Sequence, residues 1–407
     1  MKKMVKISMA VSLISTSLFA TNGDTLIGVG AKTRSMGGAG IAFSHGSEST
    51  LVNPALITSI KSNQISFGGT IFMPDVSTEI TPYSGSKKDS DADISVIPAV
   101  ALASRVTDKV YIGVGMWGTA GMGTDFRGES SLMDMETTLQ LMQFAVPLAY
   151  KFDNGLSIGV SPILQYGSLD IHYKMPPSLG GANIGDGQNQ DFGFGFAVGA
   201  FYEFCNGFSV GAVYKSPIDM EYGKSLTTAT APFSALPAFP NITDHLEQPA
   251  EYGVGFGYTF GNHSIALDYK RIAWSDAKGY KEFGWEDQDV ISAGYQYSTA
   301  CWSVRFGYNH SDNPIKNFNG TGRDMTGATL NMFNLLGFPA TAKDHITFGG
   351  TYIFNEKFSL DVTGVYGLKS STTSKISALS GLGLRGVDSI SNDHSEMGVT
   401  VQLNYNF

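Results

Sequence analysis

The end of the chain, residues 394–407, alternates between apolar and polar side chains and finishes on an aromatic residue. In an extended strand, successive side chains point to opposite faces. One face of this segment would carry Val399, Val401, Leu403, Tyr405 and Phe407, and the other would carry Thr400, Gln402, Asn404 and Asn406. A strand with an apolar outer face, a polar inner face and an aromatic border is typical of a β-barrel that spans an outer membrane.

The same alternation recurs along the chain from residue 64 onward. We expect strands at 64–74, 94–106, 109–117, 139–152, 155–172, 191–205, 207–222, 248–260, 262–274, 288–299, 301–310, 344–354, 357–369 and 394–407. Very short connections rich in Asn and Gly, which accept the positive φ of tight turns, alternate with long connections. Such asymmetry between the two rims is typical of bacterial barrels. The sequence therefore predicts an all-β fold, a 14-stranded antiparallel transmembrane β-barrel over residues 64–407.

A soluble β-sandwich is the other all-β interpretation. Its aromatic strand faces would have to meet water, and so long a series of strands would leave exposed edges that promote aggregation. Charged residues make up 15% of the chain, whereas an average soluble domain has about 25%. A surface that is partly covered by lipid explains this deficit better.

Residues 1–20 have the features of a secretory signal peptide. Lys2, Lys3 and Lys6 precede an apolar stretch at 9–19, and cleavage is expected after Ala20. An exported chain with this strand pattern is expected in the bacterial outer membrane as a multi-pass protein. The formal charge of −9 becomes −12 once the three lysines are removed, and an acidic chain argues against binding to nucleic acid.

Residues 21–63 precede the first expected strand and are rich in Gly and Ser. A barrel of fourteen strands is about 28 Å wide, which is too wide for its own side chains to fill. We therefore expect residues 21–63 to form a hatch, or plug, inside the lumen. A disordered periplasmic tail is the alternative, but the segments 37–42 and 51–56 are more apolar than a solvated tail needs to be.

Several short motifs resemble the FadL/TodX family of outer-membrane transporters for long-chain fatty acids and other hydrophobic compounds. They lie at Ser35–Gly40, Asn53–Ala55, Gly113–Gly115, Gly123–Phe126, Tyr214–Pro217, Leu267–Lys270, Trp274–Asp276, Pro339–Ala340 and His345–Gly349. The Asn-Pro-Ala element at 53–55, ahead of the expected strands, is the most specific of these motifs. The resemblance covers almost the whole chain after residue 20.

The resemblance implies a fourteen-stranded barrel with an N-terminal hatch, capture of a hydrophobic substrate outside the cell, and lateral release through an opening in the wall. The family places this opening at the third strand, where Gly113 and Gly115 stand in this sequence. Glycine inside a strand marks a bulge or bend; alternatively, the two glycines make room for the hatch. Release would follow a movement of the hatch near Asn53, Pro54 and Ala55. Bulky residues at the two glycines are expected to block uptake.

Three of the long connections contain more apolar residues than a loop in water needs. These residues are Leu132, Met133, Met135, Leu139, Leu141 and Met142 in one, Phe233, Leu236 and Phe239 in another, and Met325, Leu330, Met332, Phe333, Leu335, Leu336 and Phe338 in the third. Exposed apolar patches mark binding surfaces, and Met makes such surfaces adaptable. We expect the ligand to contact Leu132, Met135, Phe333, Leu335, Leu336 and Phe338. The loops would equally well pack on one another and cap the barrel, and the two interpretations are compatible.

A fatty acid carries a carboxylate that is costly to bury without a cation. Arg305, Lys270 and Lys215 are the basic side chains expected to face the lumen, and we predict that they bind the ligand. A salt bridge is the favoured alternative for Arg305, with candidate partners Asp268, Glu203, Glu251 and Asp361. An uncharged hydrocarbon needs no such cation.

These features favour passive uptake of hydrophobic molecules, either long-chain fatty acids or hydrocarbons, by a monomer. A general porin or a surface adhesin is the alternative; a porin would have an open polar channel and no hatch. The seven histidines show no catalytic spacing with a nucleophile, and no Cys or His spacing suits a metal, so we expect neither an enzyme nor a cofactor. Other expected partners are outer-membrane lipid, detergent after extraction, and the barrel-assembly machinery, which the family resemblance implies for the Phe407 end.

Overall fold

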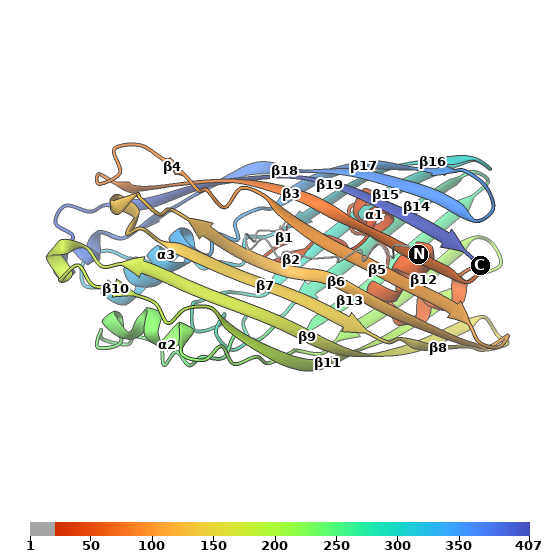
Figure 1. Cartoon of the computed structure of the whole chain (residues 1–407), viewed down its shortest axis with the longest axis horizontal. Helices are drawn as coiled ribbons and strands as arrows, with labels where there is room; N and C mark the ends of the chain where they lie inside the picture. The colour runs from red at the N-terminus through yellow and green to blue at the C-terminus, as the bar shows by residue number, and fades with distance from the viewer. Residues whose placement is uncertain (1–20) are drawn as a thin grey trace, which may run out of the picture.

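The computed structural model describes residues 21–407, so the predicted signal peptide lies outside the described residues. Within the described chain, fourteen wall strands form an antiparallel barrel, and one of them is split into β7 and β8 (Figure 1). The wall consists of β3 (Gln64–Thr81), β5 (Ser95–Arg105), β6 (Val110–Asp125), β7 (Glu136–Ala145), β8 (Leu148–Lys151), β9 (Leu156–Lys174), β11 (Asn189–Glu203), β12 (Phe208–Lys215), β13 (Glu251–Phe260), β14 (His263–Ile272), β15 (Gln288–Ser298), β16 (Trp302–Ser311), β17 (Asp344–Ile353), β18 (Phe358–Lys375) and β19 (Ser389–Asn406).

The first and last wall strands close the barrel. β19 pairs with β3 along its whole length, from Ser389 opposite Thr81 to Asn406 opposite Gln64, and the other wall strands pair with their neighbours in sequence. A closed sheet has no free edges, so its backbone groups are satisfied without water. The predicted fourteen-stranded antiparallel barrel is confirmed.

Aromatic and aliphatic side chains cover the outer face of the wall. Phe194 on β11 and Phe67 on β3 are 77% and 66% exposed. The predicted alternation holds on β19, where the valines and the leucine face outward while Thr400, Gln402 and Asn404 are buried in the lumen. Apolar surface on this scale is stable only against lipid.

Several strands are longer than the sequence pattern predicted. β3 continues to Thr81, β6 to Asp125 and β18 to Lys375, and β19 begins at Ser389. The added residues of β18 and β19 are mostly Ser, Thr, Asn and Asp, yet they remain paired across the two strands. The alternation of apolar residues marks only the lipid-facing part of a strand, because the backbone ladder continues beyond it toward the long loops.

Proline shortens or interrupts two predicted strands. The segment predicted at 139–152 forms β7 and β8, which are separated at Pro147. β12 ends at Lys215 instead of the predicted residue 222, and Pro217 follows it. Proline has no N–H to donate to the ladder, which explains both departures.

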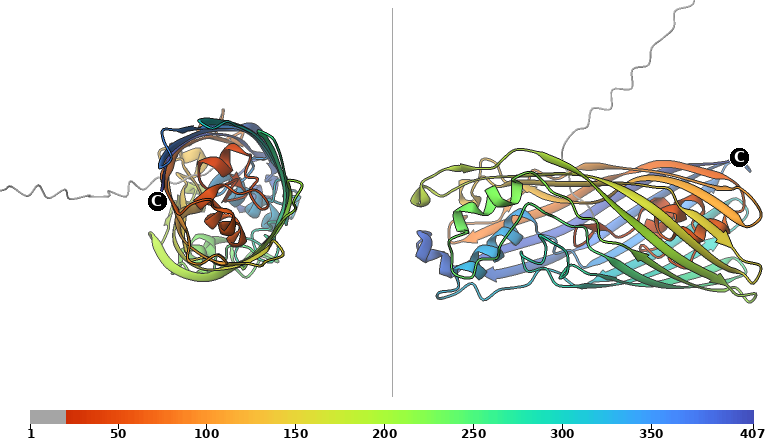
Figure 2. Two further views of the ribbon diagram at one scale, coloured as in Figure 1. Left: turned by 90° about the vertical axis from the view of Figure 1, so that its right-hand side faces the viewer. Right: turned by 90° about the horizontal axis from the view of Figure 1, so that it is seen from below.

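Residues 21–63, here called the hatch, lie inside the barrel near the end with the short turns (Figures 1 and 2). They form the short strands β1 (Thr21–Asn22) and β2 (Thr25–Leu26), the helix α1 (Ala31–Ser35) and the 3₁₀ helices η1 (Gly46–Leu51) and η2 (Pro54–Ser59). Gln402 of β19 accepts the N–H of Ala31 at 3.3 Å and donates to Glu48 Oε1 at 2.6 Å. The polar face of the last strand therefore meets a folded segment and not an open channel.

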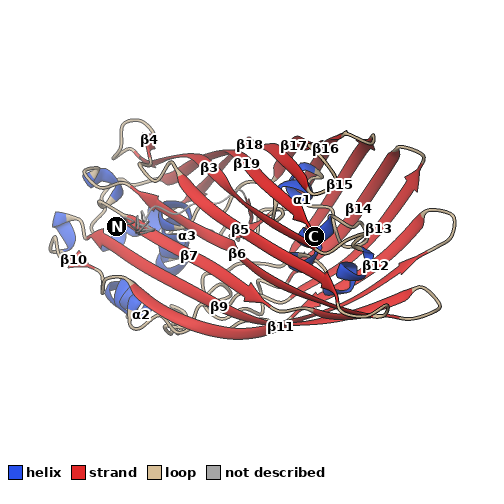
Figure 3. Ribbon diagram, turned by 45° about the vertical axis from the view of Figure 1, so that its right-hand side comes forward, coloured by secondary structure: helices blue, strands red, loops and turns tan. Residues whose placement is uncertain are grey.

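The long connections gather at the opposite end of the barrel and carry the remaining described helices (Figure 3). They contain η3 (Ser130–Leu132), η4 (Pro177–Leu179), α2 (Ser225–Thr230), η5 (Ala231–Phe233), α3 (Met325–Gly337) and η6 (Ser377–Leu382), with the short strands β4 (Lys88–Asp89) and β10 (Asn183–Ile184). In bacterial barrels the long loops face the exterior and the short turns face the periplasm. Between residues 21 and 407, no helix has the length and apolar character needed to cross a membrane.

Candidate ligand-binding site

The apolar residues predicted in the long loops are buried. This holds for Leu132, Met135, Phe333, Leu335 and Leu336, which are at most 3% exposed, and Phe338 is partly buried. Leu139, Leu141 and Met142 are not loop residues, because β7 already begins at Glu136. The expected exposed capture patch is therefore wrong for this structure. The loops pack on one another and cap the barrel, which was the alternative, and ligand contact by these residues stays a prediction.

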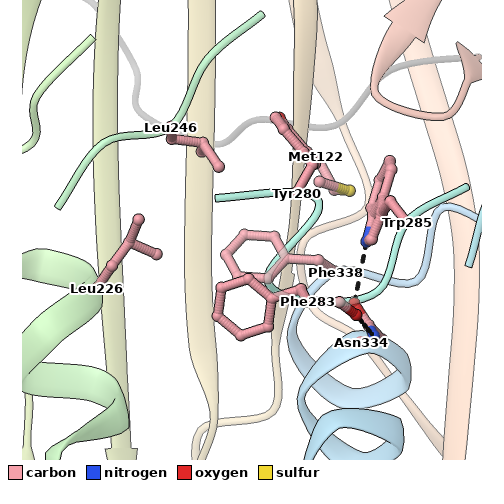
Figure 4. A pocket seen from close by; sticks show the side chains of 8 residues that line it. All are labelled: Met122, Leu226, Leu246, Tyr280, Phe283, Trp285, Asn334 and Phe338. Carbon is pink, nitrogen blue, oxygen red and sulfur yellow. Dashed lines mark hydrogen bonds between the residues drawn. The ribbon is translucent and has the colours of Figure 1, made fainter. Parts of the chain in front are cut away.

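An apolar cavity lies beneath this cap, between α2, α3 and the loop 273–287 that joins β14 to β15 (Figure 4). It is lined by Met122, Leu226, Leu246, Tyr280, Phe283, Trp285, Asn334 and Phe338, and its volume is about 20 Å³. None of these eight side chains carries a charge. The free space is narrow, so a guest larger than water requires lining side chains to turn aside.

Hydrogen bonds hold the wall of this cavity together. Trp285 donates Nε1–H to Asn334 Oδ1 at 3.0 Å, and Asn334 donates through Nδ2 to the carbonyl of Phe283 at 2.8 Å (Figure 4). These bonds join α3 to the loop 273–287 and satisfy polar atoms that burial would otherwise leave unpaired. The surface that faces the cavity is consequently almost wholly aromatic and aliphatic.

The first residues of the hatch pack directly behind this aromatic wall. Tyr280 donates its hydroxyl to Asp24, and Gln248 Nε2 donates to Asp24 Oδ2 at 2.8 Å. Burial raises the pKa of Asp24 to about 6. Trp274 packs on Tyr280 with ring centroids 4.6 Å apart, and Gly23 leaves room for this indole, because a Cβ there would lie 2.6 Å from Trp274 Cζ2. The hatch and the cavity therefore share a wall.

A second cavity shares Met122 with the first. It is lined by Thr21, Gly23, Val76, Gly121, Met122, Gly123, Pro339, Ala340 and His394, and its volume is about 20 Å³. Met122 of β6 therefore stands between the two cavities. Because Thr21 and Gly23 belong to the hatch, any shift of the first hatch residues changes the shape of the second cavity.

The three cations that were predicted to bind the ligand are paired with acids of the wall. Lys215 Nζ and Lys270 Nζ lie 3.3 and 4.0 Å from Glu251 Oε2, and Arg305 Nη1 lies 3.7 Å from Asp361 Oδ1. None of the three lines either apolar cavity. The structure thus has the salt bridge that was the alternative for Arg305, and ligand binding by these cations stays a prediction.

The same acid of β18 fastens the hatch. Lys32 Nζ of α1 lies 3.6 Å from Asp361 Oδ2. Glu48 Oε2 accepts the backbone N–H groups of Lys32 and Thr33, at the start of α1, at 3.0 and 3.1 Å. A buried carboxylate is tolerated where such donors and cations surround it. The inward charges at this level of the lumen therefore hold the hatch in place.

The Asn-Pro-Ala element of the hatch, residues 53–55, docks into a notch of the wall. Asn53 Oδ1 accepts the N–H of Ala55 at 3.0 Å, and Asn53 Nδ2 donates to a hatch carbonyl at 2.8 Å. Gly159 on β9 and Gly199 on β11 stand opposite each other at this point. A Cβ on either glycine would collide with the docked element, so glycine at these two inward positions creates the notch.

The predicted lateral opening lies on β6. The pairing of β5 with β6 runs unbroken past Gly113 and Gly115, and on the other side the N–H of Gly113 donates to the carbonyl of Pro147, between β7 and β8, at 2.8 Å. A Cβ on Gly115 would collide with Leu51 of the hatch. The register of β6 against β7 shifts just beyond Gly118. Gly115 therefore makes room for the hatch, whereas a Cβ on Gly113 would first meet Leu102 and Pro147 of the wall. A role of either glycine in release stays a prediction.

Most of the residues that line the first cavity were not predicted from the sequence. Of its lining residues, only Phe338 was among the predicted ligand contacts, whereas the loop 273–287 contributes Tyr280, Phe283 and Trp285. The available signal was the concentration of aromatic residues in this one connection. Large aromatic side chains outside the lipid-facing alternation are normally buried, and in this loop they form a cavity wall.

The chain is similar to known transport proteins in both sequence and fold. Residues 12–407 match the family described as outer membrane protein transport protein (OMPP1/FadL/TodX). A long-chain fatty acid transport protein of Escherichia coli is 26% identical over 419 residues, covering 88% of this chain and 90% of that protein. The solved toluene transporter TodX of Pseudomonas putida superposes with a TM-score of 0.68 at 18% identity, covering 93% of this chain and 99% of that one. A FadL homologue of Pseudomonas aeruginosa gives 0.72 at 16% identity, covering 95% and 100%. The two structures share the barrel fold, and the family match shows that this chain belongs to the OMPP1/FadL/TodX family of outer-membrane transport proteins, which are transporters and not enzymes.

Proposed function

We propose that this transporter takes up uncharged hydrophobic compounds by passive diffusion and that the capped cavity is the internal binding station. The supporting observation is the cavity itself, which neutral side chains, half of them aromatic, line between the loop cap and the hatch. Burial of apolar surface is favourable by about 25 cal/mol per Å². A carboxylate bound there would find no cation among the lining residues, and an unpaired buried charge is costly.

The names of the relatives include both classes of substrate. The Escherichia coli protein is named for long-chain fatty acids and the Pseudomonas putida protein for toluene. Aromatic side chains pack well against flat rings through edge and face contacts, so the lining favours neutral hydrocarbons. A fatty acid would have to compete with Glu251 and Asp361 for Lys215, Lys270 and Arg305.

The proposed route begins at the apolar cap, whose loops have to separate for a compound to enter. Met side chains in the cap allow such repacking, because they are flexible and polarizable. From the first cavity the compound would pass Met122 into the second cavity, beside the hatch. Release would be lateral, where β6 is paired irregularly with β7 and β8 near Pro147, after a movement of the hatch near Asn53.

Uptake of labelled toluene, with labelled palmitate in parallel, by cells that carry this protein as their only transporter of the family tests the proposal. Leu226→Trp fills the cavity from α2, and we expect toluene uptake to fall on the order of tenfold, equivalent to about 1.4 kcal/mol of lost binding. Arg323→Trp adds the same side chain at an exposed loop position and should leave uptake unchanged. Normal toluene uptake by Leu226→Trp would refute the cavity's role, and faster uptake of palmitate would refute the preference for neutral compounds.

Planar-bilayer conductance distinguishes this function from that of a general porin. The hatch and the loop cap occupy the lumen, so we expect only small currents from the wild-type protein. A steady large current would support the porin instead. Mass spectrometry of compounds that copurify with the protein would identify the natural substrate class.

A further inference from the structure

A buried carboxylate holds the first described nitrogen of the chain. Thr21 is 3% exposed, and its backbone nitrogen lies 3.2 Å from Glu396 Oε2 of β19. The side chain of Glu396 is fully buried in the lumen. Thr21 is also the residue that begins the mature chain when the signal peptide is cut after Ala20, as its sequence predicts.

We infer that the α-ammonium group freed at Thr21 is a built-in cation of the lumen and forms a buried ion pair with Glu396. Cleavage adds water across the bond between Ala20 and Thr21: the oxygen goes to the new carboxylate of Ala20, and the nitrogen of Thr21 leaves as an amine that takes up a proton. In the uncut chain the same nitrogen is a neutral amide. Export processing therefore creates a positive charge beside a carboxylate that is already in place.

Two histidines share Glu396 with the nitrogen of Thr21. His345 Nε2 lies 2.8 Å from Oε2. His394 Nε2 lies 3.1 Å from Oε1, while its Nδ1 lies 3.0 Å from the carbonyl of Pro339. Arg34 is also buried in this region, but its guanidinium is not within 4.0 Å of the Glu396 carboxylate. The nitrogen of Thr21 is thus in contact with a carboxylate that two histidines also contact and that, within residues 21–407, makes no ion pair with a Lys or Arg side chain.

The next residue supplies a second observation. Asn22 is fully buried, and its Oδ1 and Nδ2 have no hydrogen-bond partner within the described part of the chain. Buried amide groups are normally satisfied. An ammonium group has three N–H donors where a peptide nitrogen has one, so cleavage brings two further donors to a place that contains an unpaired acceptor.

The ion pair would fix the hairpin formed by β1 and β2. This hairpin lines the second cavity through Thr21 and Gly23, and it supports Tyr280 of the first cavity through Asp24. Removal of one partner from a buried charge pair is strongly destabilising. The pair at Thr21 therefore stabilises the wall between the two cavities, and it forms only after the signal peptide is removed.

Acylation of the purified full-length mature protein by a small N-hydroxysuccinimide ester tests the pair. N-terminal sequencing should start at Thr21, and the wild-type amine should react slowly. Glu396→Gln should speed this reaction on the order of tenfold, because the amine is no longer held. Glu286→Gln is the matched control, since this exposed acid pairs with Lys316 at the surface. Heat-modifiable migration on gels verifies that each barrel has assembled.

A second variant removes the charge from the other side. The N-terminal glutamine of Thr21→Gln cyclises to pyroglutamate, which has no ammonium group, whereas Thr21→Ser keeps it. We expect Thr21→Gln and Glu396→Gln to raise hydrogen exchange of residues 21–30 equally, the double variant to add nothing, and Thr21→Ser to match wild type. Additive effects, a mature chain that starts elsewhere, or a wild-type amine that reacts as fast as in unfolded protein would each overturn the inference.

Discussion

Asp268→Ala should loosen the hatch at a defined point. Asp268 Oδ2 on β14 accepts the N–H groups of Gly40 and Ile41 at 2.7 and 2.9 Å, and the side chain is 5% exposed. A hydrogen bond to a charged group contributes about 1.5 to 3 kcal/mol. Two such bonds, less the desolvation cost of the buried carboxylate, leave a net contribution of about 3 kcal/mol to holding this segment.

Amide hydrogen exchange measures that contribution residue by residue. A loss of about 3 kcal/mol in the free energy of local opening speeds exchange at Gly40 and Ile41 on the order of 100-fold. Asp268→Asn keeps an acceptor oxygen, so we expect a smaller effect, about tenfold. Ser264→Ala is the control, because Ser264 lies on the same inward face of β14 and its hydroxyl is 3.1 Å from Thr259 within the wall.

The pattern of exchange decides the outcome. Protection at Gly40 and Ile41 that stays at the wild-type level in Asp268→Ala would refute the anchor. A rise that is equal over the hatch and the whole barrel would also refute it, since a global loss of stability would then explain the result. A rise confined to the hatch supports the anchor.

Three other variants test separate contacts. Burial raises the pKa of Asp24 to about 6 from 3.8, so the stability that its protonated form contributes is present below about pH 4 and is lost as the pH rises through 6. Between pH 4 and pH 7, the free energy of unfolding of Asp24→Asn, measured by thermal unfolding, should therefore rise relative to wild type by up to about 3 kcal/mol. Parallel pH profiles of the two proteins would contradict this. Asn53→Ala removes the cap of η2 and the bonds to nearby carbonyls, so the hatch should lose about 1 to 3 kcal/mol of local stability. Proteolysis within the hatch should therefore become faster. Gly115→Ala should displace Leu51 at a cost of about 1 to 3 kcal/mol; if uptake is lost and Leu51→Ala restores it, hatch displacement is the cause, whereas uptake that stays blocked supports an exit at β6.

The wall of the barrel could be predicted because its physical cause is local. A strand between lipid and lumen has to alternate, and Val399 and Val401 report the facing of β19 without reference to any other strand. The ends of the strands could not be predicted in the same way, since Ser370 to Lys375 of β18 carry no apolar alternation and yet pair with β19. Tight turns and strand count therefore follow from the sequence, whereas strand length depends on pairing beyond the membrane.

The cavity and the charge pairs depend on contacts between distant segments. Trp285 and Asn334 are brought together only by packing of α3 on the loop 273–287. Arg305 faces the lumen as predicted, but which acid it meets depends on the register of β16, β17 and β18. Residue type predicted that a partner was needed, and only the fold determined that Asp361 is the partner.

The lumen is divided by polarity, and this division bears on the exit route. Near the short turns, Arg305 and Asp361 of the wall and Lys32 and Glu48 of the hatch form charged contacts, so an apolar compound gains nothing by entering that region and would have to break these contacts to cross it. Beneath the cap, the lining carries no charge. Under the proposed function, a hydrophobic compound that leaves the cavity is expected to move sideways, toward lipid, and not through the hatch toward water, because transfer of apolar surface into water is unfavourable. This asymmetry is in line with the lateral release proposed above, whose exact place on β6 stays a prediction.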